Sequence, residues 1–82
     1  MKRRIVIVAY PDVELLDVAG PASVFANAGA AHYAVSVLAP GAGAVATSSG
    51  LRIVADHGCA DLPRRVDTVI VAGGEGTRAA CA

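Results

Sequence analysis

Apolar runs alternate with glycine- and proline-containing breaks along this chain, and the spacing of apolar positions differs between runs. Residues 4–10 form a continuous β-branched run that shows no polar alternation after Arg4, which is typical of a parallel strand covered on both faces. Residues 33–39 and 67–72 have the same character and predict two further buried strands. Residues 13–19 have helical spacing, and Pro21 suits the first turn of a second helical piece. The pattern therefore predicts two strands joined by a crossover helix in two pieces, followed later by a third strand.

The ends of the predicted helix carry their own signals. Asp12 is expected to cap its first turn, and residues 27–29 contain the asparagine and glycine of a stop signal. The apolar positions of the second piece recur at three- and four-residue steps: Ala22, Val24, Phe25 and Ala28.

The rest of the chain adds shorter elements. Residues 45–48 and 51–55 are separated by Ser49 and Gly50 and predict a short hairpin at the edge of the sheet. Residues 56–65 are irregular with one helical turn, and a helix is expected from Glu75. The order of elements predicts an α/β fold: a partial doubly wound, flavodoxin-like parallel sheet with a short edge hairpin, truncated at the C-terminus.

Composition and charge narrow the class of protein. The chain has 82 residues, of which 55% are hydrophobic and 17% charged, so it holds one small domain or part of one and must bury a core. Seven basic residues balance seven acidic ones, and no basic block follows Arg4, so DNA is expected to be bound only by another segment. The longest apolar run, residues 5–9, is far below the roughly 20 residues of a membrane span. We expect a cytoplasmic protein that makes no contact with a membrane.

The two cysteines also indicate a reducing compartment such as the cytoplasm. Cys59 and Cys81 have no zinc-type spacing and are expected to be reduced, buried thiols. His57 and Cys59 supply only two of the four ligands that a metal site needs, so an ordinary loop is favoured. Neither a metal nor another cofactor is expected.

Three sequence stretches together resemble a known family. The run LLDVAGP at residues 15–21 follows the first strand and precedes Val24 and Phe25, and SSGLRI at residues 48–53 and DTVIVAGG at residues 67–74 come in the same order. The combination resembles the N-terminal half of the DJ-1/PfpI superfamily, which has the class I glutamine amidotransferase-like fold. It is most similar to the domain at the front of GlxA-type AraC-family transcription regulators, with isocyanide hydratases as close relatives.

The resemblance implies a site at the carboxyl ends of the strands. Asp17 matches the family acid that reaches a nucleophilic cysteine, and Gly73 and Gly74 match the glycine pair that helps to form an oxyanion or ligand-binding site. The family places that cysteine on a strand-to-helix elbow beyond residue 82, and neither Cys59 nor Cys81 matches the elbow. Residues 1–82 are therefore expected to be the N-terminal part of a single PfpI-like domain, without the elbow half and any helix-turn-helix.

Each candidate residue also has a plainer interpretation. Asp17 suits a helix cap or dipole partner, and Glu14 suits a solvated first-turn residue, although the two share a helix face and a carboxylate dyad is conceivable. The pair Gly73 and Gly74 suits a tight turn, which needs small residues. Residues 74–79 fit the pattern G-x-G-x-x-A of dinucleotide sites only weakly. Asp67 begins its strand rather than ending it, which excludes a phosphoacceptor receiver.

These observations lead to one main hypothesis and two others. The main one is a ligand-sensing or dimerisation part of an AraC-family regulator, with an unknown small-molecule ligand. It is a homodimer when complete and binds DNA through a missing C-terminal segment. The second is part of a cysteine enzyme of the isocyanide-hydratase kind, with Asp17 assisting the nucleophile. The third is a dinucleotide-binding fragment.

Overall fold

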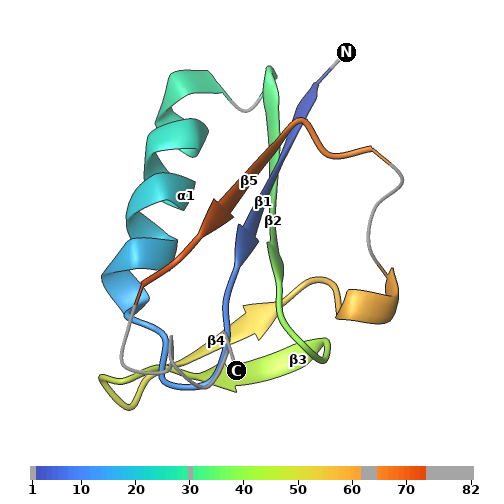
Figure 1. Cartoon of the computed structure of the whole chain (residues 1–82). Helices are drawn as coiled ribbons and strands as arrows, with labels where there is room; N and C mark the ends of the chain where they lie inside the picture. The colour runs from blue at the N-terminus through green and yellow to red at the C-terminus, as the bar shows by residue number, and fades with distance from the viewer. Residues whose placement is uncertain (1, 30, 62–64, 74–82) are drawn as a thin grey trace.

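A parallel sheet forms the centre of the structure, a computed structural model that describes residues 2–29, 31–61 and 65–73. Its strands in the described residues are β1 (Arg3–Val8), β2 (Tyr33–Leu38) and β5 (Thr68–Val71). The sheet order is β2-β1-β5, and both pairings are parallel (Figure 1). The predicted α/β class, the parallel sheet and the central position of the first strand are confirmed.

Helix α1 (Leu15–Gly29) connects β1 to β2 and lies along the sheet (Figure 1). Val18 is buried in the main apolar cluster together with Ile7 of β1, and Ala22 packs against that cluster. The predicted crossover between two parallel strands is therefore confirmed, and so is the end of the helix at its glycine stop signal.

The helix runs unbroken through Pro21, so the prediction of two helical pieces is wrong. A proline inside a helix removes one backbone hydrogen bond, and its ring crowds the Cβ of the preceding residue. That preceding residue is Gly20, which has no Cβ for the proline ring to crowd. The glycine therefore relieves part of the steric conflict that makes proline a helix breaker.

The start of the helix also differs from expectation. Asp12 has φ of 65° and occupies a turn, in the left-handed region that aspartate adopts more readily than most residues. The Glu14 carboxylate accepts a hydrogen bond from the Leu16 N–H at 3.4 Å. The expected cap at Asp12 is therefore wrong, and Glu14 takes that position.

Strands β3 (Gly43–Ala46) and β4 (Arg52–Ala55) form the predicted antiparallel hairpin, with different bounds. They make a separate two-stranded sheet near the carboxyl ends of the parallel strands (Figure 1). The Gly50 N–H donates to the Thr47 carbonyl at 3.0 Å, and the Thr47 N–H donates to the Leu51 carbonyl at 2.9 Å. Gly50 has φ of 91°, so the loop is a turn closed by a glycine bulge, and it takes residues that the sequence pattern assigns to strands.

The segment after β4 runs along the outer edge of β2. The Asp56 N–H donates to the Val37 carbonyl at 2.8 Å, and the Asp56 carboxylate accepts from the Val37 N–H at 2.7 Å. The Ala39 N–H donates to the His57 carbonyl at 3.0 Å. This segment thus covers the carboxyl-terminal half of that edge, and the short 3-10 helix η1 (Cys59–Asp61) confirms the single helical turn.

Burial is uneven across the sheet. Ile5, Val6 and Ile7 are each at most 2% exposed, which confirms a first strand covered on both faces. Val69 is 57% exposed and Val71 69% exposed, so within the described residues the predicted covering of the last strand is incomplete. Among the described residues β5 pairs with β1 alone, and its register places both valines on the face opposite to Ile7.

Further predictions concern the cysteines and the C-terminal residues. Cys59 is exposed, so its expected burial is wrong, whereas Cys81, Gly74 and the helix from Glu75 lie outside the described residues. In the described part of the chain no helix has the length and apolar character needed to cross a membrane.

Candidate functional site

Three parts of the chain meet at the carboxyl edge of the parallel sheet. The loop that follows β1 is bonded to the hairpin on one side, where the Asp12 N–H donates to the Ala46 carbonyl at 2.9 Å. On the other side the Glu14 N–H donates to the Gly73 carbonyl at 2.9 Å. Open parallel sheets place their ligand crevices outside this edge, so the loop holds the start of α1 where such sites occur.

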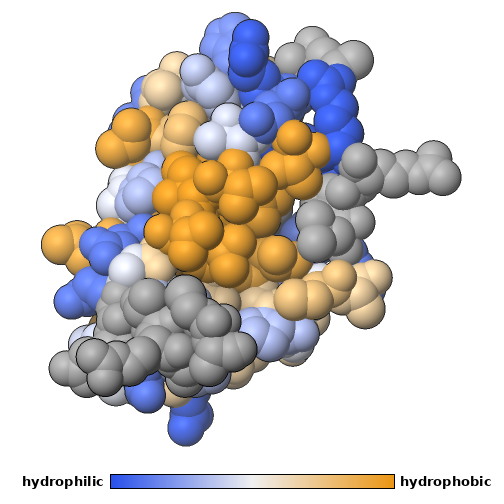
Figure 2. Space-filling view, viewed as in Figure 1, coloured by the Kyte–Doolittle hydropathy of each residue, from blue (hydrophilic) through white to orange (hydrophobic). Residues whose placement is uncertain are grey.

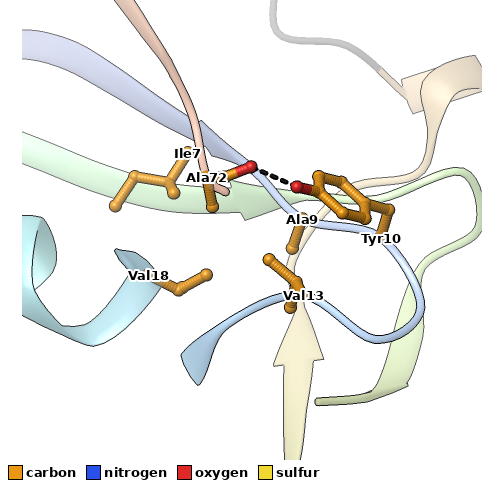
Figure 3. Close-up of a cluster of buried hydrophobic side chains, with 6 residues drawn as sticks. All are labelled: Ile7, Ala9, Tyr10, Val13, Val18 and Ala72. Carbon is orange, nitrogen blue, oxygen red and sulfur yellow. Dashed lines mark hydrogen bonds between the residues drawn. The ribbon is translucent and has the colours of Figure 1, made fainter. Parts of the chain in front are cut away.

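A buried contact anchors the same loop to the end of β5. The Tyr10 hydroxyl donates a hydrogen bond to the Ala72 carbonyl, and both residues are buried (Figure 3). Val13 has no exposed surface and lies in the same apolar cluster, beside Ala9 and Val18 (Figure 3). The loop is therefore fixed by apolar packing as well as by backbone hydrogen bonds.

This anchoring brings together two residues that the sequence singles out 56 positions apart, Asp17 and Gly73. A Cβ built on Gly73 would lie 2.9 Å from Oδ2 of Asp17, closer than real Cβ contacts occur. The absence of a side chain at Gly73 therefore lets the carboxylate lie against the end of β5. Asp17 itself is exposed, in the first turn of α1.

The pair defines what the site can do chemically. An ionised carboxylate only accepts hydrogen bonds, so Asp17 can orient a ligand or a side chain that presents an N–H, O–H or S–H donor. The oxyanion role implied for the glycine pair also depends on Gly74, which lies outside the described residues. The role of these residues stays a prediction, and the geometry establishes that Asp17 and Gly73 are neighbours.

Glu14 has a different place from Asp17. Its carboxylate turns to the Leu16 N–H, and its carbonyl accepts from the Asp17 N–H at 3.1 Å. This arrangement matches the plainer interpretation of Glu14 as a first-turn residue that satisfies the helix terminus.

Asp67 lies at the opposite, amino edge of the sheet. Its carboxylate accepts from the Arg4 N–H at 2.7 Å, and its N–H donates to the Arg4 carbonyl at 2.9 Å. The hydrogen bond from the Arg4 backbone, supported by the Arg65 guanidinium at 3.3 Å, lowers the pKa of the Asp67 carboxyl. Asp67 thus ties the starts of β1 and β5 together and is separate from the candidate site.

Cys59 contacts a different part of the chain from Asp17. The Cys59 thiol donates to the Ala39 carbonyl at 3.7 Å, beside the outer edge of β2. Among the residues that the structure describes, no group of three or more histidine, cysteine or acidic side chains is placed to bind a metal ion.

Sequence reasoning missed Tyr10 and Thr47, which position the site without belonging to it. The buried Thr47 hydroxyl donates to the Leu51 carbonyl at 2.7 Å and shapes the hairpin loop beside the site. A tyrosine directly after a buried strand was the available signal, because a buried phenol needs a hydrogen-bond partner. Its partner, Ala72, was not predictable from spacing.

Comparison with known proteins gives a consistent result. A family model described as the DJ-1/PfpI family matches residues 3–81. A Streptomyces lividans protein described as an uncharacterized protein in the cpoL 5′ region is 35% identical over 74 residues, which cover 88% of this chain and 52% of that protein. The chain therefore spans about half the length of this curated relative.

Solved structures share the fold. A THiJ/PfpI family protein from Pseudomonas syringae matches with a TM-score of 0.86 and 26% identity, covering 98% of this chain and 33% of that one. An AraC family transcriptional regulator from Pseudomonas putida matches with a TM-score of 0.68 and 24% identity, covering 88% of this chain and 47% of that one. At these identities and coverages the matches establish the architecture of the shared part.

Proposed function

The chain belongs to the DJ-1/PfpI family, and from that membership we propose that it is the ligand-sensing or dimerisation part of an AraC-family transcription regulator. In this proposal residues 1–82 are the N-terminal part of one cytoplasmic PfpI-like domain. A segment beyond residue 82 supplies the elbow and the DNA-binding helix-turn-helix. The observation that carries the proposal is that the run LLDVAGP, which most resembles regulators of this type, forms the first turns of α1 and places Asp17 beside Gly73 at the carboxyl edge of the sheet.

Two further observations support a regulator. The run LLDVAGP and the segment SSGLRI most resemble regulators of this type, and the structure uses both stretches at the candidate site, as the first turns of α1 and as the hairpin loop. The fold match to the Pseudomonas putida protein described as an AraC family transcriptional regulator is consistent with the same assignment.

A cysteine enzyme of the isocyanide-hydratase kind is the second candidate, and the position of Asp17 favours it equally. An exposed carboxylate beside the end of β5 is placed to hydrogen-bond to a thiol that arrives on a neighbouring elbow. In that reaction the elbow thiol would pass its proton to Asp17 while its sulfur adds to the isocyanide carbon, and Asp17 would return the proton to that carbon. Water would then add to the resulting thioimidate carbon, and loss of the thiol would release the N-substituted formamide. In this hypothesis the chain supplies the acid and the glycine pair Gly73 and Gly74, whose amides would hold the developing charge.

One observation separates the two candidates. The coding DNA read past codon 82 is expected to continue into a strand, a cysteine elbow and later a helix-turn-helix. An elbow without a helix-turn-helix would support the enzyme, and a stop codon with unrelated sequence beyond it would contradict both. In the restored full-length protein, Asp17→Asn is expected to change the rate of alkylation of the elbow thiol or its pH dependence, with the fold intact. An unchanged alkylation profile with lower thermal stability would indicate a capping role.

The 82-residue chain offers a direct test of its own. It has no elbow cysteine and a net charge of +0, so we expect no hydration of an isocyanide and no duplex DNA binding at physiological salt. Assays of isocyanide loss and of the mobility of labelled duplex check both. Measurable turnover, or binding below about micromolar concentration, would overturn the proposed division of roles.

A further inference from the structure

The loop after β1 contains a tight turn at residues 10–13. The Val13 N–H donates to the Tyr10 carbonyl at 3.0 Å and closes the turn. Its two central residues are Pro11 and Asp12, and Asp12 has a φ of 65°. A proline at the first central position and a positive φ at the second are the features of a type II turn. In this turn type the position of Asp12 normally holds glycine or asparagine.

The local sequence fits a second turn type equally well. A type I turn also favours proline at its first central position, and its second central residue has a negative φ that aspartate adopts without strain. The two types differ by rotation of the central peptide group, here Pro11–Asp12, through about half a revolution. The local preference of Asp12 therefore favours type I, and a contact outside the turn has to hold it in type II.

That contact is a hydrogen bond to the hairpin. The Asp12 N–H donates to the Ala46 carbonyl of β3 at 2.9 Å. In a type I turn this N–H would point away from the hairpin, and the Pro11 carbonyl would face the Ala46 carbonyl instead. Both of those oxygens are acceptors, so a type I turn and the observed position of the hairpin exclude each other. Within the described residues the Pro11 carbonyl accepts no hydrogen bond that would oppose the rotation.

Solvent is available to the peptide group in both positions. Pro11 and Asp12 are exposed, and their turn lies beyond the carboxyl ends of the parallel strands (Figure 1). Figure 2 shows a continuous hydrophobic patch that lies over those strands. The rotated N–H and carbonyl would therefore be hydrated, without the cost of burying an unpaired polar group.

From these observations we propose that the Pro11–Asp12 peptide is a two-position switch beside the candidate site. In the type II position the turn holds the hairpin through the Ala46 carbonyl, and in the type I position it releases the hairpin. The same loop continues into Glu14, whose N–H is bonded to the Gly73 carbonyl at 2.9 Å. The switch thus lies between the hairpin and the end of β5.

The switch supplies the two states that a ligand sensor needs. A ligand shifts an equilibrium between two conformations by the difference in its affinity for them. A ligand at the carboxyl edge that contacts this loop would favour one position of the peptide and so hold or release the hairpin. This consequence rests on the proposed function, whereas the two positions follow from the turn and its bond to the hairpin.

The test is relaxation dispersion of the backbone amides of the isotope-labelled chain, which detects minor states that exchange in microseconds to milliseconds. In the wild type, the amides of Asp12, Thr47 and Ser48 should report one shared process with a minor state of about 0.1–10%. Absence of exchange at these amides would overturn the proposal. Exchange at Asp12 that the hairpin amides do not share would overturn it too.

Two variants separate the backbone of Asp12 from its carboxylate. Asp12→Gly and Asp12→Ala both remove the carboxylate, but only glycine adopts positive φ as readily as negative φ. The ratio of minor to major state should therefore be about tenfold higher in Asp12→Ala, because a residue with a Cβ disfavours the left-handed conformation. Equal ratios in the two variants would contradict the switch.

A narrower comparison remains if Asp12→Ala fails to fold by circular dichroism. Exchange should then be weaker in Asp12→Gly than in the wild type, and exchange that is unchanged or stronger would overturn the proposal. None of these results depends on whether the intact protein is a regulator or an enzyme, so failure of the proposed function and failure of the switch can be told apart.

Discussion

Replacing Tyr10 by phenylalanine removes the hydroxyl that holds the end of β5 to the loop after β1. The Tyr10 ring is only 4% exposed, and its hydroxyl donates to the buried Ala72 carbonyl. The lost hydrogen bond is worth about 0.5–1.5 kcal/mol net, and leaving a buried carbonyl without that donor raises the total to about 1–3 kcal/mol. For a domain of this size, each kcal/mol lowers the melting temperature by about 4–8 °C.

Tyr33→Phe is the matched control, because Tyr33 is the only other tyrosine and contributes its ring to a contact with Phe25 at 5.1 Å between centroids. Melts followed by far-UV circular dichroism, at one protein concentration, should show the melting temperature of Tyr10→Phe lowered by about 4–24 °C and that of Tyr33→Phe close to the wild type. Coincident melts of the two variants would refute the reasoning that this hydroxyl secures the carboxyl edge.

Three further outcomes follow from named contacts. Asp67→Asn should lower stability at neutral pH. Urea melts give the difference in the free energy of unfolding between the wild type and this variant. Because folding lowers the pKa of the Asp67 carboxyl, this difference should have its full size above about pH 4 and should disappear as the pH falls through the lowered pKa. A difference that persists at strongly acid pH would contradict this. Gly50→Ala should cost about 1–3 kcal/mol because its φ is 91°, whereas Gly41→Ala, with open space and no left-handed φ, should be near neutral. Gly73→Ala should leave stability nearly unchanged but turn the Asp17 carboxylate away in a crystal structure, and an unmoved carboxylate would show that the close approach is incidental.

The main elements of the fold were readable from the sequence because they rest on local pattern. The β-branched run at residues 4–10 has no polar alternation, and the structure places β1 at the centre of a parallel sheet. The glycine after Ser49 predicted the hairpin turn, and the left-handed conformation of Gly50 gives the physical reason. Periodicity and turn chemistry act within a few residues, so a single sequence contains them.

The errors came from contacts that local pattern does not contain. Proline normally breaks a helix, and the small preceding residue Gly20 together with packing of Val18 and Ala22 keeps α1 continuous through Pro21. The exposure of Val71 reflects which strands are available to cover β5 and was not encoded in the apolar run itself.

The candidate site was predicted in part. The resemblance singled out Asp17 and Gly73 separately, and the structure brings the two together. Two hydrogen bonds bring these residues together, one from the Glu14 N–H to the Gly73 carbonyl and one from the Tyr10 hydroxyl to the Ala72 carbonyl. Both join segments about 60 residues apart. Long-range hydrogen bonds of this kind have no signature in local spacing.

The contact between Asp17 and Gly73 is the central claim, and one measurement tests it most directly. Amide chemical shifts of the isotope-labelled chain are compared between the wild type and Asp17→Asn, with Asp56→Asn as a control at an exposed carboxylate beside β2. A carboxylate against the end of β5 should make the Gly73 amide one of the most shifted signals outside the first turns of α1, and the control should leave it in place. A Gly73 signal that is unmoved by Asp17→Asn, with shifts confined to α1, would contradict the account.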